Sequence, residues 1–352
     1  MKAGGQTWTA GLFADNDIAE TFSDDALFAS FCRFEQALIR GLAKAGLVTP
    51  EDATHLVEQI AGFEPDGTAI AEAGVRDGVP VPEYVRQLRA HVTSPAKTML
   101  HHGATSQDLM DTATIEALAA TNRLLAKRLE TLLGLLAGLS ARNGGNDLQA
   151  ITRMQPAIPF HAADRIATWR QPLQSLHDRL PELGDQTRLL QFGGAVGDLQ
   201  ALGDNAGTVT ETIAFELGLR WPGHSWHSAR SPVLAHANWM SELTGTLGKI
   251  GQDVALMALR GNQDIELSGG GSSSAMPHKQ NPVTAERLVT LARFNATLVS
   301  GMHHAQVHEL ERSGAAWMLE WMILPQMCET AAASLTAASA LIGSIQELGK
   351  PA

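Results

Sequence analysis

Residues 268–282, which read SGGGSSSAMPHKQNP, combine several hydroxyl side chains with the cation Lys279. The segment leads into a helix start signalled by Asn281 and Pro282. Helix N-termini carry free backbone N–H groups and a partial positive charge, so a nearby hydroxyl and a lysine there suit an anion or oxyanion. The segment is therefore a candidate anion site, although its composition alone favours a flexible Gly/Ser linker between helices.

A second polar segment, residues 101–112, reads HHGATSQDLMDT. Thr105, Ser106 and Gln107 offer hydrogen-bond donors for a carboxylate at the start of a helix. Taken alone, the segment fits an ordinary helix N-cap cluster better than a substrate site. Together with the first segment, it indicates a site for a carboxylate substrate.

Both segments resemble signature regions of the fumarase/aspartase superfamily. Residues 273–281 are similar to its loop G-S-S-x-M-P-x-K-x-N, with Ser272 standing where glycine is usual. Residues 101–112 are similar to its first signature, in which Thr and Ser open the first long helix. The resemblance covers about residues 95–325 and implies an all-α fold built around a bundle of long helices.

A third region departs from the superfamily pattern G-R-T-H-x-Q-x-A-x-P. Residues 150–159 read AITRMQPAIP, so Thr152 and Gln155 match while Arg153 occupies the histidine position. A guanidinium does not release its proton at neutral pH and cannot serve as a general acid. A carboxylate leaving group needs no such acid and pairs well with a fixed guanidinium. The departure thus favours lactone opening and its reverse, the intramolecular addition of a carboxylate to a conjugated double bond.

This reaction belongs to one family of the superfamily, the 3-carboxy-cis,cis-muconate cycloisomerases of protocatechuate catabolism in the β-ketoadipate pathway. The sequence resembles that family also in residues 191–197 (QFGGAVG) and 226–230 (WHSAR). The resemblance implies conversion of 3-carboxy-cis,cis-muconate to 4-carboxymuconolactone through a carbanion. It also implies a homotetramer in which three copies share each active site, and no metal or organic cofactor.

The resemblance assigns roles to individual residues. Ser273 would exchange the proton at the carbanion carbon, and Ser274 is the alternative residue for this role. The Ser273 alkoxide would have to be stabilised by loop amides, the helix N-terminus and Lys279. Arg153 would orient the attacking carboxylate or offset its charge. The remaining candidates would bind the substrate's carboxyl groups: Thr105, Ser106, Gln107, Thr152, Gln155, Lys279, Asn281, His101 and His227.

Two other functions stay open at this point. One is a C–N lyase of the adenylosuccinate or argininosuccinate lyase type, which would use another acid such as His101 or His227. The other is a non-catalytic structural relative. The presence of Ser273, Lys279 and Asn281 argues against this function. His304 and His308 have a spacing that can bind zinc, but a solvated helix face is the better interpretation.

The elements that must position these residues are long helices. Leucines recur at helical spacing over residues 112–142, and a second apolar stripe covers 231–257. A third helix is expected from Asn281 towards Pro325. Helices of roughly 30 residues are about 45 Å long, and covering their apolar faces favours packing between subunits. Patterns typical of β-strands are nearly absent.

The expected organisation is a small helical N-terminal domain (residues 1–95), a central bundle (96–345) and a short tail (346–352), with little or no third domain. Shorter helices are predicted for residues 26–45 and 50–62.

The composition limits the partners. A net charge of −11 in 352 residues argues against nucleic acid. No stretch reaches the about 18 apolar residues of a membrane span, and no signal peptide is visible. Two cysteines, Cys32 and Cys328, fit a reducing cytoplasm.

Overall fold

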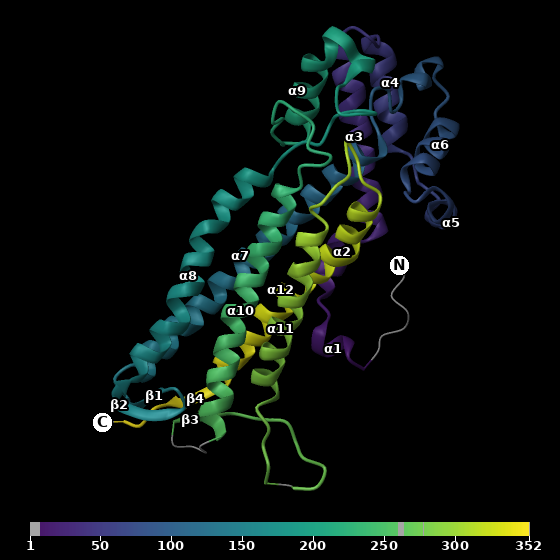
Figure 1. The fold of residues 1–352 in the computed structure, drawn as a ribbon. Coiled ribbons are helices and arrows are strands. Elements are labelled where there is room, and N and C mark those ends of the chain that lie inside the picture. Colours follow the sequence, from purple (N-terminus) through teal and green to yellow (C-terminus); the bar gives the residue numbers. More distant parts are fainter. Residues whose placement is uncertain (1–7, 260–263, 277, 352) are drawn as a thin grey trace.

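Long helices dominate the computed structural model, which describes residues 8–259, 264–276 and 278–351. Five of them form an elongated bundle, and most of the shorter helices gather at one end of it (Figure 1). The bundle helices are α7 (Ser106–Asn143), α8 (Ala162–Thr187), α10 (Ser231–Leu259), α11 (Val283–His304) and α12 (Ala315–Ser344). The other helices are α1 (Ala10–Phe13), α2 (Asn16–Thr21), α3 (Asp24–Lys44), α4 (Pro50–Ala61), α5 (Gly67–Asp77), α6 (Val81–His91), η1 (Pro95–Met99), η2 (Gln200–Asn205) and α9 (Ala206–Glu216). The all-α prediction is confirmed.

The leucine spacing of α7 produces the bundle core. Leu118, Leu125, Leu132 and Leu139 are all buried, because steps of seven residues return to the same helix face. α10 contributes a matching stripe, from Val233 to Met257, to the same core. With 38 residues, α7 is about 57 Å long and spans the bundle from end to end.

The prediction of one helix from Asn281 towards Pro325 was wrong. α11 ends at His304, residues 305–314 form a loop, and α12 then runs through Pro325. The loop sequence interrupts the apolar period, and Leu310 within it is exposed and has φ 50°. α12 tolerates a proline, which removes one backbone hydrogen bond, because the apolar residues around it are buried in the bundle core.

One short β-hairpin and one separate pair of antiparallel strands were not expected from the sequence. β1 (Asp147–Thr152) pairs with β2 (Gln155–His161), and β3 (Ile265–Leu267) pairs with β4 (Ile345–Leu348). The β1–β2 hairpin lies almost entirely in solvent, so its sequence lacks the alternation of a half-buried strand. Both strand pairs lie at the end of the bundle opposite α4 to α6 (Figure 1).

A second hydrophobic core lies among α3, α4, α6 and α9. Phe31 and Tyr84 meet there edge to face, with ring centroids 5.2 Å apart. Phe192 and Val209, from the middle of the chain, are buried in the same core. The domain boundary near residue 95 stays a prediction, and the packing adds a segment beyond residue 189 to this end of the molecule.

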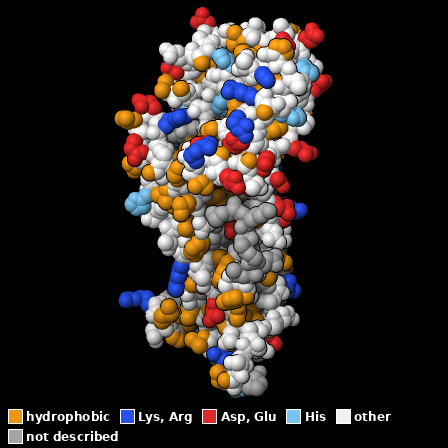
Figure 2. Space-filling model, turned by 90° about the vertical axis from the view of Figure 1, so that its right-hand side faces the viewer, with side chains coloured by type: hydrophobic (Ala, Val, Ile, Leu, Met, Phe, Trp, Pro, Cys, Tyr) orange, Lys and Arg blue, Asp and Glu red, His pale blue; other side chains and the backbone are white. Residues whose placement is uncertain are grey.

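Hydrophobic and charged side chains are unevenly spread over the surface. On the face in Figure 2, charged side chains gather towards the end that carries α4 to α6, and hydrophobic ones are more common along the bundle. Among the described residues, no helix combines the length and the apolar character that crossing a membrane requires.

Candidate active site

The predicted site residues lie at opposite ends of the bundle. His101, Thr105, Ser106, Gln107 and His227 are at the end where α7 and α10 begin (Figure 1). The hairpin with Arg153 and the loop with Ser273 are at the other end, where Asp147 bridges to Lys350 and Ser268 bonds to Ser344. Within one chain, the length of α7 separates the two groups.

At the first end, Thr105 precedes α7 and is partly exposed. Its Oγ1 accepts a hydrogen bond from Arg312, in the loop between α11 and α12. The N-terminus of α7 adds free N–H groups and the positive end of a long helix. Arg312, Thr105 and Ser106 therefore form a cationic, donor-rich end suited to a carboxylate.

Asp108 connects several segments at this end of the bundle through its buried carboxylate. Its buried carboxylate accepts hydrogen bonds from the backbone N–H groups of Thr105, Gly193 and Gly194, at 2.9, 2.9 and 3.0 Å. It also meets Nε2 of His227 at 2.8 Å. The glycines are needed for this approach, since a Cβ on Gly193 would lie 2.5 Å from Ser225 Oγ and one on Gly194 2.8 Å from a backbone oxygen. The QFGGAVG segment thus positions the start of α7.

A buried ion cluster underlies the same end. Arg230 is 1% exposed and donates to Asp111 at 2.6 and 2.9 Å and to Glu320 at 2.5 and 3.1 Å. Trp317 Nε1 also donates to Asp111, at 3.0 Å. Burial disfavours the Arg230 cation, but the two carboxylates outweigh it and raise its pKa. Burial raises the pKa of Glu320, against the opposing effect of Arg230.

Gln107 and His227 lie inside this network. The Gln107 amide nitrogen donates to Asp111 at 3.1 Å and to the His227 carbonyl at 2.9 Å, so both its hydrogens are engaged. His227 is 2% exposed, and its Nδ1 is buried without a hydrogen-bond partner. Both residues organise the end of α7 in this arrangement, while Thr105 and Ser106 stay accessible.

At the opposite end, Arg153 and Met154 form the turn of the β1–β2 hairpin. Their φ values of 48° and 65° match a two-residue turn with two left-handed residues. Thr152 and Gln155 face each other across the last pair of the hairpin. All four side chains are exposed, so the guanidinium of Arg153 projects from the tip and makes no ion pair among the described residues.

The loop of residues 268–282 lies at this end too. Gly271 and Asn281 bridge its two arms, and α11 begins two residues later. The Oγ of Ser273 accepts from the backbone N–H groups of Ala275 and Met276, at 3.3 and 3.1 Å. Lys279 and Ser274 are exposed. Pro277, which the signature includes, lies outside the described residues.

The alternative sites receive no support. α11 ends at His304, so His304 and His308 do not share a helix face, and the described residues contain no group of three or more His, Cys, Asp or Glu placed for a metal. Burial and the charge of Arg230 lower the pKa of His308.

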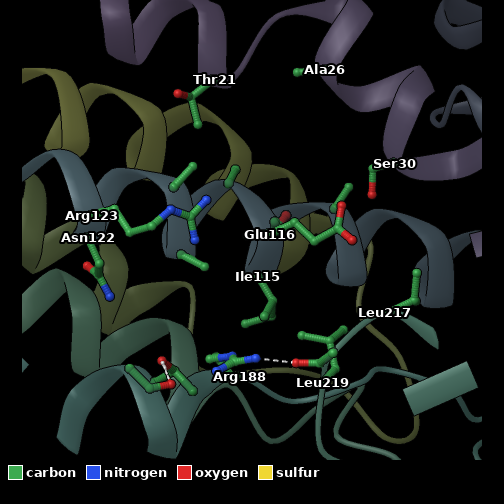
Figure 3. A pocket seen from close by; sticks show the side chains of 18 of the residues that line it. Thr21, Ala26, Ser30, Ile115, Glu116, Asn122, Arg123, Arg188, Leu217 and Leu219 are labelled. Carbon is green, nitrogen blue, oxygen red and sulfur yellow. Dashed lines mark hydrogen bonds between the residues drawn. The ribbon is translucent and has the colours of Figure 1, made fainter. Parts of the chain in front are cut away.

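A groove of about 890 Å³ lies among α3, α7 and α8, with Asn122 and Arg123 at its wall (Figure 3). None of the predicted site residues lines it.

Sequence reasoning missed Arg312, Glu35 and Glu320. Arg312 and Glu320 lie beyond the predicted signatures, in a stretch that was expected to be continuous helix. Glu35 contacts His101 across 66 residues of sequence. No local pattern marks such partners, because tertiary packing alone brings them to the site.

A family model described as Lyase matches residues 8–296. The chain belongs to this lyase family. It is similar to the 3-carboxy-cis,cis-muconate cycloisomerase of Pseudomonas aeruginosa, with 35% identity over 332 residues that cover 92% of this chain and 72% of that protein. It is 32% identical to the cycloisomerase of that name from Acinetobacter baylyi, over 93% of this chain and 74% of that protein.

A solved structure also supports membership of the lyase family. It is that of 3-carboxy-cis,cis-muconate lactonizing enzyme from Pseudomonas putida. It superposes with a TM-score of 0.89 at 30% identity, over 97% of this chain and 77% of that chain. The resemblance to the fumarase/aspartase superfamily, and within it to the cycloisomerases, is thereby confirmed.

Proposed function

We propose that the chain is a cycloisomerase that converts 3-carboxy-cis,cis-muconate to 4-carboxymuconolactone. The similarity to proteins named for this reaction, at 32–35% identity over nine-tenths of the chain, carries the proposal. Arg153, in place of the superfamily histidine, supports it from the chemistry, because a carboxylate adds or leaves without a general acid.

In the proposed mechanism, one substrate carboxylate oxygen attacks the diene and forms the C–O bond of the lactone. The displaced π electrons pass onto a neighbouring carboxyl group as a carbanion. Ser273 then donates its hydroxyl proton to the carbanion carbon and is reprotonated from solvent. The reaction therefore consumes one proton, as one carboxylate charge is replaced by an ester.

The contacts of Ser273 suit this role. A serine alkoxide is strongly basic and needs stabilisation, and the N–H groups of Ala275 and Met276 already point at Oγ. Lys279 and the N-terminus of α11 lie in the same loop and add positive charge. Arg153 would hold the attacking carboxylate through paired N–H donors.

We further propose that a homotetramer assembles each site from several copies. Thr105 and Ser106 would come from one copy, the Arg153 hairpin from a second and the Ser273 loop from a third. The separation of these segments along α7 supports this, as do exposed apolar side chains along the bundle, such as Phe294 and Met322, which are 45% and 67% exposed. A cytoplasmic location is part of the proposal.

The test is direct. Purified protein is mixed with 3-carboxy-cis,cis-muconate in chelator-treated buffer, and the ultraviolet absorbance of the diene is followed. We expect its loss with formation of a lactone that, in D2O, carries one carbon-bound deuterium. Turnover of adenylosuccinate or argininosuccinate instead would overturn the proposal in favour of a C–N lyase, and no turnover of any of them would favour a structural relative.

A further inference from the structure

His101 and Glu35 form a pair that the reaction scheme does not use. Glu35 lies on α3 with its side chain 0% exposed, and both of its hydrogen bonds among the described residues come from His101. Oε2 accepts from the backbone N–H of His101 at 2.9 Å, and Oε1 meets Nδ1 at 2.8 Å. One carboxylate thus holds both the backbone and the ring of one residue.

The contact with Glu35 determines which nitrogen of the His101 ring is available for another partner. When Glu35 is a carboxylate it only accepts hydrogen bonds, and Nδ1 of His101 is then the donor of the 2.8 Å contact. No described residue hydrogen-bonds Nε2, and the His101 side chain keeps 16% of its surface exposed. The other neighbours of Glu35, Cys32 and Tyr84, stay uncharged, because burial raises the pKa of both. Among the described residues, His101 is therefore the hydrogen-bond partner that Glu35 has at both oxygens.

The backbone conformation and position of His101 support its placement at a carboxylate site. His101 has φ 62°, a left-handed conformation that is uncommon outside glycine. The same loop continues to Thr105, where Arg312 and the N-terminus of α7 concentrate positive charge. The loop is thus held against strain at the end of the bundle suited to a carboxylate.

We infer that Glu35 is a positioning residue that holds His101 as a cation, with Nε2–H directed at a carboxylate of the substrate. The inference rests on the proposed function for the identity of the substrate. Glu35 acts through His101 and makes no contact with the substrate itself. A carboxylate bound at Nε2 would place the ring between two carboxyl groups, one at each ring nitrogen.

Two substitutions separate this role from a structural one. His101→Asn retains an amide N–H near the position of Nδ1, keeps the bond to Glu35 and suits φ 62° better than histidine does, but it lacks Nε2. Glu35→Gln keeps an oxygen for the backbone N–H and turns its amide N–H₂ to Nδ1. The ring proton then moves to Nε2, which leaves a neutral donor in place of a charged one.

We expect Glu35→Gln to raise KM about tenfold with kcat within about threefold, the difference between a charged and a neutral hydrogen bond. His101→Asn should raise KM by about 100-fold or more while its thermal midpoint stays at the wild-type value. The double variant should match His101→Asn, since Glu35 acts through the missing nitrogen.

A wild-type KM in His101→Asn would overturn the inference, as would an unchanged KM in Glu35→Gln. A collapse of kcat in Glu35→Gln with unchanged KM would assign His101 to proton transfer instead. Calorimetric titration with tricarballylate, a simple tricarboxylate, repeats the comparison as Kd without turnover. Failure of the proposed function then appears as absent muconate turnover, and failure of this inference as equal Kd values for wild type and His101→Asn. A Glu35→Gln variant that does not fold leaves His101→Asn as the deciding case.

Discussion

His236 of α10 makes the stability of the bundle depend on pH in a predictable way. The side chain is 2% exposed, and its Nε2 meets Asn122 Nδ2 at 2.8 Å. Because Nε2 accepts this hydrogen bond, the ring is held neutral. Burial lowers the pKa of His236 from 6.5 to about 4.

The lowered pKa of His236 determines the direction in which stability changes with pH. Above pH 6.5 the histidine is neutral in both the folded and the unfolded chain, and it does not affect stability. As the pH falls from 6.5 towards 4, the unfolded chain binds a proton that the folded chain does not, so stability falls. At about 1.36 kcal/mol per pH unit, the loss is about 2 kcal/mol at pH 5 and approaches about 3.4 kcal/mol below pH 4.

Urea unfolding at pH 7.5 and pH 5.0, at one fixed protein concentration, measures this loss. His236→Gln keeps an acceptor for Asn122 and removes the titrating ring, so it should lose about 2 kcal/mol less than wild type between the two pH values. His55→Gln, which removes an exposed imidazole, is the matched control and should behave like wild type. Equal losses in wild type and His236→Gln would refute the reasoning.

Two further predictions concern the proposed site and its support. Ser273→Ala should lower kcat by about 10²- to 10⁴-fold in the diene absorbance assay, whereas Ser274→Ala, the adjacent control, should stay close to wild type. Equal effects of the two would contradict the assignment of the proton donor. Arg230→Met should lower the free energy of unfolding in urea by about 3–5 kcal/mol, because Asp111 and Glu320 would be left as buried carboxylates without their cation. A loss below about 1 kcal/mol would show that the cluster is not held by its charges.

The sequence predicts the bundle better than the parts attached to it. α7 and α10 follow from leucine and other apolar spacing, which packing alone determines. α8 was missed because Pro172 and Pro181 interrupt its pattern, although the helix continues through both. The β1–β2 hairpin was missed because exposed strands carry no burial pattern.

The site was predictable to the extent that its residues share a short segment. Thr105 and Ser106, or Ser273 and Lys279, can be recognised from spacing within one signature. The partners that fix them could not be recognised, because Glu35 and Arg312 reach the site only through folding. Gln107 stays a predicted substrate contact, and the structure adds that its amide nitrogen donates to Asp111.

The distance between the predicted segments leads to one last prediction. If each site takes its Arg153 hairpin from one copy and its Ser273 loop from another, the inactive variants Arg153→Gln and Ser273→Ala should complement each other. After joint denaturation and refolding of equal amounts, about a quarter of the sites would receive both segments intact, as random assembly of a closed homo-oligomer requires. Activity should return to about that fraction of wild type.

The matched control mixes Ser273→Ala with Lys279→Ala. Both changes lie in the same loop, so every loop in the mixture carries one defect and no site can be intact. Two affinity tags, one on each variant, verify that mixed oligomers form. Mixed oligomers without recovered activity would place Arg153 and Ser273 of the same copy in one site, and the hairpin and the loop would then have to meet at the end of the bundle they already share.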